Sequence, residues 1–148
     1  LTSGLAGFAS AWKKAAQDPT FRTVQDQVTN ELYFDPAMRK ADSMGLKTAL
    51  GRTILFDTIV QHGEGDDPDS LDALVSATNQ QMHGTPAEGM AEAAWLKTFL
   101  TVRRNNLLHP HNPETQEVWA KSVGRVDVFL DLLKAGNFDL KKGGDVPE

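Results

Sequence analysis

One acidic and two basic residues occupy positions in this sequence where apolar residues would be expected. Asp57 lies in the middle of the apolar run 54–60, and Arg103 and Arg125 fall on helical stripes of mainly apolar residues further along the chain. A buried carboxylate is costly unless cations and hydrogen bonds accompany it, and a guanidinium can bridge two carboxylates. We therefore expect Asp57, Arg103 and Arg125 to converge in the core. One acid between two arginines leaves a net positive charge, so such a site would accept a further carboxylate. The alternative is that Asp57 faces solvent or forms a single structural salt bridge.

The elements that would position these residues are helices. No stretch shows sustained alternation of apolar and polar residues, so the pattern predicts an all-α fold. Asp18-Pro19, Asp35-Pro36 and Asp67-Pro68 are typical helix starts, because the carboxylate can cap free N–H groups while proline fixes the first helical φ. The helices are expected at residues 6–17, 19–33, 36–44, 46–62, 68–82, 88–107 and 114–135.

Length and composition limit the possible classes of protein. The 148 residues, of which 40% are hydrophobic, suit one helical domain over residues 1–140 with a flexible tail at 141–148. No apolar run approaches the roughly 20 residues that cross a bilayer, so we expect no membrane partner. The net charge of −5 disfavours nucleic acid and suits a polycationic ligand. The absence of cysteine excludes disulfides and thiolate metal sites.

Two other groups of residues have the composition of metal sites. His109 and His111, with His62 or His83, could bind zinc. The acidic stretch 63–69 could bind calcium, but it lacks the glutamate that an EF-hand places at its twelfth position. Scattered histidines are more often surface or cleft residues, and the acidic stretch suits a capped loop. We therefore expect no metal and no cofactor. The three tryptophans fall on helical stripes and are expected in the core rather than as sugar platforms.

Several short motifs, in the same order and at matched spacing, resemble the glycoside hydrolase family 46 chitosanases. They cover nearly the whole chain: Tyr33–Ala37, Gly45-Leu46, Phe56–Gly63, Asp67-Pro68, Phe99–Arg103, Arg125–Asp127 and Leu133–Leu140. The resemblance implies a lysozyme-like helical fold, here the major lobe of a two-lobed enzyme. It also implies secretion and hydrolysis of β-1,4 bonds in chitosan, with inversion at the anomeric carbon. The expected ligands are chitosan and glucosamine oligosaccharides.

The resemblance also implies roles for individual residues. Residues matching Asp57, Arg103 and Arg125 form a charge network with the general-acid glutamate of the family. The histidine matching His62 lies beside the substrate cleft, which makes His62 a candidate substrate-binding residue. A tryptophan matching Trp12 packs in the core. Glu114 is a candidate counterpart of a substrate-binding acid in the family, although the connection between the two arginines looks longer here.

The catalytic pair of the family has no counterpart in this sequence. In the family the general acid and the water-activating aspartate lie upstream of the region that resembles residue 1, and inversion needs two carboxyl groups roughly 6.5–9.5 Å apart. We identify no catalytic residue in this chain and expect an N-terminal segment outside it to supply both groups. The alternative is a non-catalytic helical module that binds carbohydrate or another partner on the same scaffold.

Overall fold

The computed structural model describes residues 7–140, and these residues form helices, turns and loops without a β-strand. The all-α prediction is therefore confirmed. No helix in this range is long and apolar enough to span a membrane. The chain divides into two compact units, Leu1–Pro36 and Ala37–Glu148, and the prediction of one domain over residues 1–140 stays a prediction. The tail predicted at 141–148 lies outside the described residues.

The first unit contains two α-helices, α1 (Phe8–Ala15) and α2 (Pro19–Thr29), followed by a π-helical turn at Asn30–Phe34. The carboxylate of Asp18 accepts a hydrogen bond from the N–H of Thr20 and Pro19 is the first helical residue, as predicted. Trp12 is 46% exposed and meets the ring of Phe21 edge-on at 5.3 Å between centroids. Trp12 is therefore not a core residue in this structure, contrary to the prediction, and α2 beside it has no buried residue.

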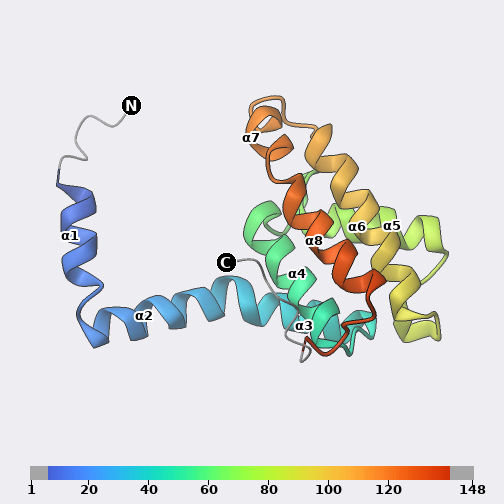
Figure 1. Cartoon of the computed structure of the whole chain (residues 1–148), viewed down its shortest axis with the longest axis horizontal. Helices are drawn as coiled ribbons and strands as arrows, with labels where there is room; N and C mark the ends of the chain where they lie inside the picture. Colours follow the sequence, from blue (N-terminus) through green and yellow to red (C-terminus); the bar gives the residue numbers. More distant parts are fainter. Residues whose placement is uncertain (1–6, 141–148) are drawn as a thin grey trace. The chain divides into compact units, whose positions relative to one another are not determined.

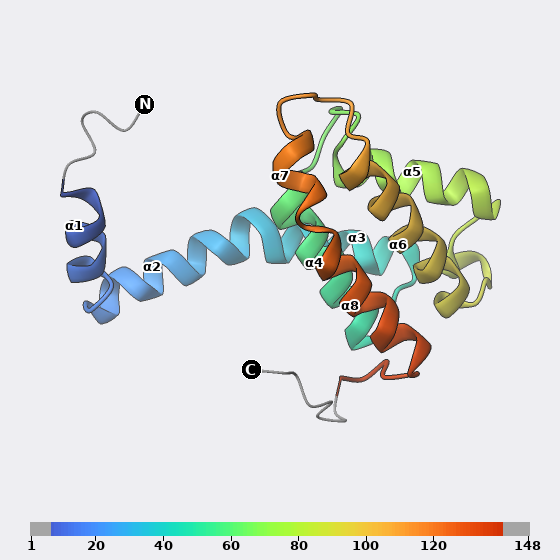
Figure 2. The ribbon, with the colours of Figure 1, turned by 45° about the horizontal axis from the view of Figure 1, so that its top comes forward.

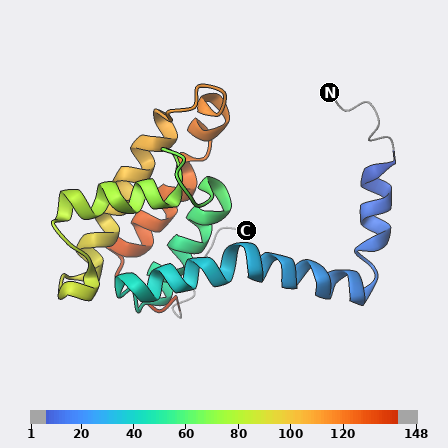
Figure 3. The same ribbon diagram turned by 180° about the vertical axis from the view of Figure 1, so that it is seen from behind.

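The second unit is built around α6 (Glu92–Leu108), which packs against α5 (Leu71–Met82) on one side and α8 (Val123–Lys134) on another. α8 runs back alongside α6 after the short α7 (Gln116–Ala120) reverses the chain (Figure 1). α4 (Ala49–His62) contacts both α5 and α8 and lies behind α8 in Figure 2. Seen from behind, α5 crosses α6 (Figure 3). The core consists of apolar side chains from these helices, from α3 (Asp35–Met44) and from the connection after α3, among them Ala41, Leu46, Leu50, Ile54, Leu55, Trp95, Leu96, Phe99, Leu100 and Leu107.

Two of the helix starts that differ from the predictions, those of α4 and α5, are set by capping hydroxyl groups. The hydroxyl of Thr48 accepts the N–H of Gly51 and begins α4 at Ala49, three residues later than expected. Ser70 caps α5, so Asp67-Pro68 opens a turn instead of the helix. A capping hydroxyl needs no proline after it, which makes both starts harder to find in the sequence.

The last predicted helix, 114–135, is divided into α7 and α8 by two residues, Lys121 and Ser122. The Asp35-Pro36 pair does begin α3, but Asp35 is its first residue and directly follows the π-helical turn. Gly45 ends α3 with φ +75°, and a Cβ there would lie 2.6 Å from the backbone nitrogen of Ala87. Both the positive φ and this close approach require glycine.

Candidate active site

Asp57 pairs with two arginines from two other helices of the second unit. Its Oδ2 lies 2.8 Å from Nη1 of Arg103 on α6, and its Oδ1 pairs with Nη2 of Arg125 on α8. The side chain of Asp57 is only 12% exposed, although it lies on α4 among apolar residues. Asp57 is therefore paired with both arginines, and it neither faces solvent nor has a single partner.

Arg103 is the most deeply buried member of this charge network, with no exposed side-chain surface. Its Nε donates to Nε2 of His62 at 3.2 Å, and its Nη2 donates to Oε1 of Gln61 at 2.7 Å. Burial lowers the pKa of the Arg103 guanidinium, and the negative charge of Asp57 opposes that shift. An arginine pKa is high enough that the group stays a cation at neutral pH. Three acceptors therefore hold one buried positive charge.

Arg125 does not lie in the core, contrary to the prediction. Its side chain is 55% exposed and only its tip reaches Asp57. The buried residues of α8 are Val123 and Val126, so the face that α8 turns to the core is offset from the predicted stripe. Arg125 therefore lies at the edge of that face. The network has a buried cation on one side of Asp57 and a solvated cation on the other.

Both ring nitrogens of His62 are used inside the protein. Nε2 accepts from Arg103, which leaves Nδ1 to carry the proton and donate to the carbonyl of Asp69 at 2.8 Å. Burial and the positive charge of Arg103 lower the pKa of His62 to about 4. The residue is only 9% exposed, and its ring contacts that of Trp119 edge-on at 4.7 Å. Both ring nitrogens of His62 are therefore occupied by protein partners, and its role in binding substrate stays a prediction.

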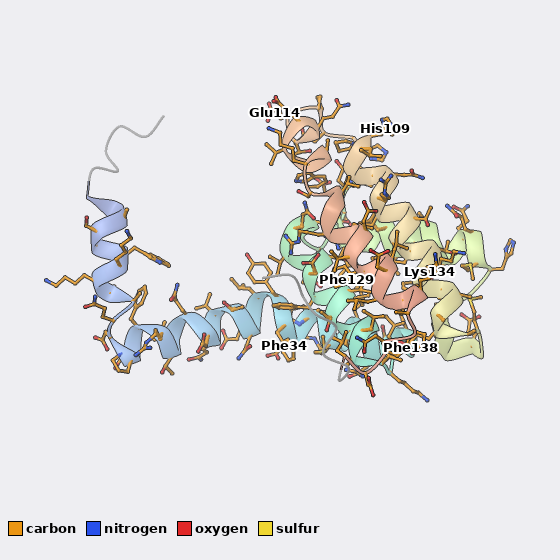
Figure 4. The ribbon with its side chains drawn as sticks, viewed as in Figure 1. Phe34, His109, Glu114, Phe129, Lys134 and Phe138 are labelled. Carbon is orange, nitrogen blue, oxygen red and sulfur yellow. The ribbon has the colours of Figure 1, made fainter. Side chains whose placement is uncertain are left out.

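Glu114 lies in the connection between α6 and α7, and its side chain is exposed. Its backbone N–H donates to Oδ1 of Asn112 at 3.0 Å, and its carboxylate forms no ion pair within residues 7–140. Figure 4 shows Glu114 and His109 at the α7 end of the unit, with Lys134 and Phe138 towards the other end. Glu64, Asp66 and Asp67, in the loop after α4, are also exposed. That Glu114 binds substrate stays a prediction.

Two residues of the site were not predicted from the sequence. Gln61 accepts a hydrogen bond from Arg103, and Asp69 holds the loop that leads to Glu114. His62 was predicted beside the substrate cleft, but not as an acceptor for Arg103. The only sequence signal for Asp69 was the acidic stretch 63–69 to which it belongs. Among residues 7–140, no group of three histidine or acidic side chains has the geometry of a metal site.

The comparison with known families gives one match that covers almost the whole chain. The family described as Glycosyl hydrolase family 46 matches residues 2–143. A chitosanase from Bacillus subtilis (strain 168) is 50% identical over 139 residues, which are 94% of this chain and 50% of that protein. The chain thus spans about half the length of the curated relatives that it matches.

Solved structures give the same result. The complex of a Gynuella sunshinyii GH46 chitosanase with chitotetraose is 48% identical, with a TM-score of 0.91 over 96% of this chain and 59% of that one. Native chitosanase from Bacillus subtilis MY002 is 49% identical, with a TM-score of 0.90 over 95% of this chain and 58% of that one. The lysozyme-like helical fold expected from the sequence is therefore confirmed.

Proposed function

The chain belongs to glycosyl hydrolase family 46, and on this premise we propose that it is part of an enzyme that cleaves β-1,4 bonds inside chitosan chains with inversion. The observation that carries the proposal is the pairing of Arg103 and Arg125 with the single carboxylate of Asp57. Two cations and one anion leave a net charge of +1 at the point where these side chains of α4, α6 and α8 meet. A nearby carboxylic acid would compensate that charge.

That carboxylic acid is proposed to be the general acid of the reaction, supplied with the water-activating carboxylate by an N-terminal segment outside this chain. An inverting glycosidase needs both groups, one to protonate the leaving oxygen and one to activate water. The arginines of the network would hold the acid in place. Asp57 neutralises one of them, which limits how far the two cations lower the pKa of the acid. This matters because a general acid must keep its proton until the bond breaks.

The proposed substrate is a polymer of glucosamine units, which carry ammonium groups. The surface near the network offers exposed carboxylates: Glu64, Asp66 and Asp67 in one loop and Glu114 in another. Both loops are tied to Asp69, so the four carboxylates belong to one end of the unit. Negative charge concentrated in this way attracts a polycation. Relatives whose structures contain chitotetraose or six glucosamine units support this choice. We also propose that the enzyme acts outside the cell, where such a polymer is met.

The test compares two forms of the protein on glucosamine hexasaccharide. One is the 148-residue chain, and the other is the same chain preceded by whatever residues its gene encodes upstream. We expect the short form to bind without cleavage and the longer form to cleave. Proton NMR of the fresh products should show the α-anomer first, since inversion converts a β linkage to α. A β-anomer would refute inversion, and cleavage by the short form would place the acid within this chain.

The alternative function is a non-catalytic module that binds carbohydrate or another partner. The carboxylate of Glu114 is exposed and forms no ion pair within residues 7–140, so it would serve such binding as well as it would serve catalysis. Binding by both forms with cleavage by neither would favour this alternative.

A further inference from the structure

Asp69 is a buried acid that lies outside the Asp57 network. It is 3% exposed and lies between the turn at Asp67-Pro68 and the capping residue Ser70. No lysine or arginine forms an ion pair with it within residues 7–140. Burying an ionised carboxylate without compensation is very costly, so its hydrogen bonds must hold the charge.

Four donors surround the carboxylate of Asp69. Oδ1 accepts from Nδ2 of Asn106 at 2.8 Å, from the backbone N–H of His111 at 2.9 Å and from Nδ1 of His111 at 2.8 Å. Oδ2 accepts from the backbone N–H of Asn112 at 2.9 Å. Burial acts to raise the pKa of Asp69, but the bonds from His111, Asn106 and Asn112 outweigh it and hold that pKa well below its usual range. The carboxylate therefore stays charged and keeps these donors at any ordinary pH.

These bonds fix the loop that carries Glu114. Two successive N–H groups of the loop, those of His111 and Asn112, bind the two oxygens of one carboxylate. Asn112 in turn accepts the N–H of Glu114 with its side chain and the hydroxyl of Thr115 with its carbonyl. The backbone of Glu114 is thus linked through Asn112 to the buried carboxylate of Asp69, while the carboxylate of Glu114 remains exposed.

Asp69 also contacts the charge network of Asp57, Arg103 and Arg125 through its backbone. The carbonyl of Asp69 accepts the Nδ1 proton of His62, whose Nε2 accepts from Arg103. Arg103 is paired with Asp57. A substitution that changes only the carboxylate of Asp69 would leave this second connection intact. The two roles of the residue can therefore be separated by experiment.

We propose that Asp69 is a positioning residue, whose carboxylate anchors residues 111–115 and so places Glu114 for binding glucosamine units. The part of this inference that concerns substrate rests on the proposed function. Aspartate is required because an asparagine has one acceptor oxygen in place of two. In Asp69→Asn the new NH2 group would face either the N–H of Asn112 or the donors of His111 and Asn106.

The first experiment measures amide hydrogen exchange in the 148-residue chain and in Asp69→Asn. We expect the amides of His111, Asn112 and Glu114 to exchange about tenfold faster or more, since hydrogen bonds to a charged group are lost. Amides of the core helix α6 should not change. Asp42→Asn is the matched control, because it makes the same chemical change at an exposed carboxylate, the partner of Arg52. Unchanged exchange in the loop, or faster exchange throughout the chain, would overturn the inference.

The second experiment separates positioning from a merely structural effect. It measures the dissociation constant for glucosamine hexasaccharide in a cycle of Asp69→Asn, Glu114→Gln and the double variant. Each single change should weaken binding about threefold, as expected for an exposed charge contact. The double variant should bind no more weakly than Glu114→Gln alone, because Asp69 acts through Glu114. Losses that multiply would overturn the inference.

Two further outcomes keep the inference apart from the proposed function. If the unaltered chain does not bind the hexasaccharide, the proposed function fails, and the exchange experiment alone decides whether Asp69 positions the loop. If Asp69→Asn does not fold, Asn112→Ala replaces it, because this change keeps the buried carboxylate and removes only the acceptor of Glu114 N–H. It should speed exchange at Glu114 and weaken binding without affecting the amide of His111. No change at Glu114 would again overturn the inference.

Discussion

Replacing Asp57 by alanine should destabilise the protein far more than replacing either an exposed acid or Arg125. The change leaves the guanidinium of Arg103 without its counter-ion in a position that water does not reach. Breaking a buried ion pair from one side costs about 3–5 kcal/mol. Arg103 keeps its bonds to His62 and Gln61, so we expect the lower part of that range.

Arg125 supplies the comparison within the same network. Its side chain is 55% exposed, so in Asp57→Ala it can turn to solvent at little cost. For the same reason Arg125→Ala should cost only about 1 kcal/mol or less, as for exposed ion pairs. In Asp57→Ala combined with Arg103→Met, an apolar side chain replaces the buried cation. That double variant should be more stable than the sum of its single changes by about 2 kcal/mol or more, since no unpaired charge remains.

Urea unfolding of the 148-residue chain, followed by circular dichroism and by tryptophan fluorescence, to which the buried Trp95 contributes, measures these differences. Asp42→Asn is the control for removal of an exposed carboxylate charge. A loss below about 0.5 kcal/mol for Asp57→Ala, the range of ordinary surface changes, would show that the ion pair with Arg103 does not carry this part of the fold. Equal losses of unfolding free energy in Asp57→Ala and Arg125→Ala would refute the conclusion that Arg103 is the buried cation and Arg125 the solvated one.

Three further outcomes follow from particular contacts. The pKa of His62 is lowered to about 4, so the unfolded chain takes up this proton first as the pH falls. Stability is then complete above about pH 6.5 and falls by up to about 3 kcal/mol as the pH approaches 4. Urea midpoints at pH 7.5 and 5 should show this fall. The same fall in His62→Gln would show that protonation of His62 is not its cause. Gly45→Ala should lower the thermal midpoint by several degrees, because a Cβ there meets the backbone of Ala87; an unchanged midpoint would mean that the short 3-10 helix at Pro86–Glu88 moves away freely. Glu92→Gln should destabilise by about 1 kcal/mol or more, since Glu92 accepts from the N–H groups of Lys47 and Thr48 and from the Thr48 hydroxyl; no loss in urea unfolding would exclude its role at the start of α4.

The core of the second unit was readable from local patterns, but its helix starts were not. A helix with apolar residues on nearly every side, such as α4, is expected to be buried, because every face would otherwise expose apolar surface to water. The start at Thr48 depends instead on Glu92, a residue 44 positions away that holds the hydroxyl of Thr48. A contact between residues so distant in sequence leaves no local pattern.

The sequence by itself determined that the chain is helical and that Asp57 needs positive partners, because secondary structure follows short periods and a carboxylate in an apolar run requires compensation. It also determined the family, through motifs that span the chain. Only the tertiary structure decided that Arg103 is enclosed and Arg125 is solvated, that His62 is a neutral acceptor, and that Asp69 holds the loop of Glu114. The physical reason is that burial and hydrogen-bond partners depend on how helices distant in sequence pack. A helical stripe shows which residues share a face, but it does not show where that face meets its neighbours.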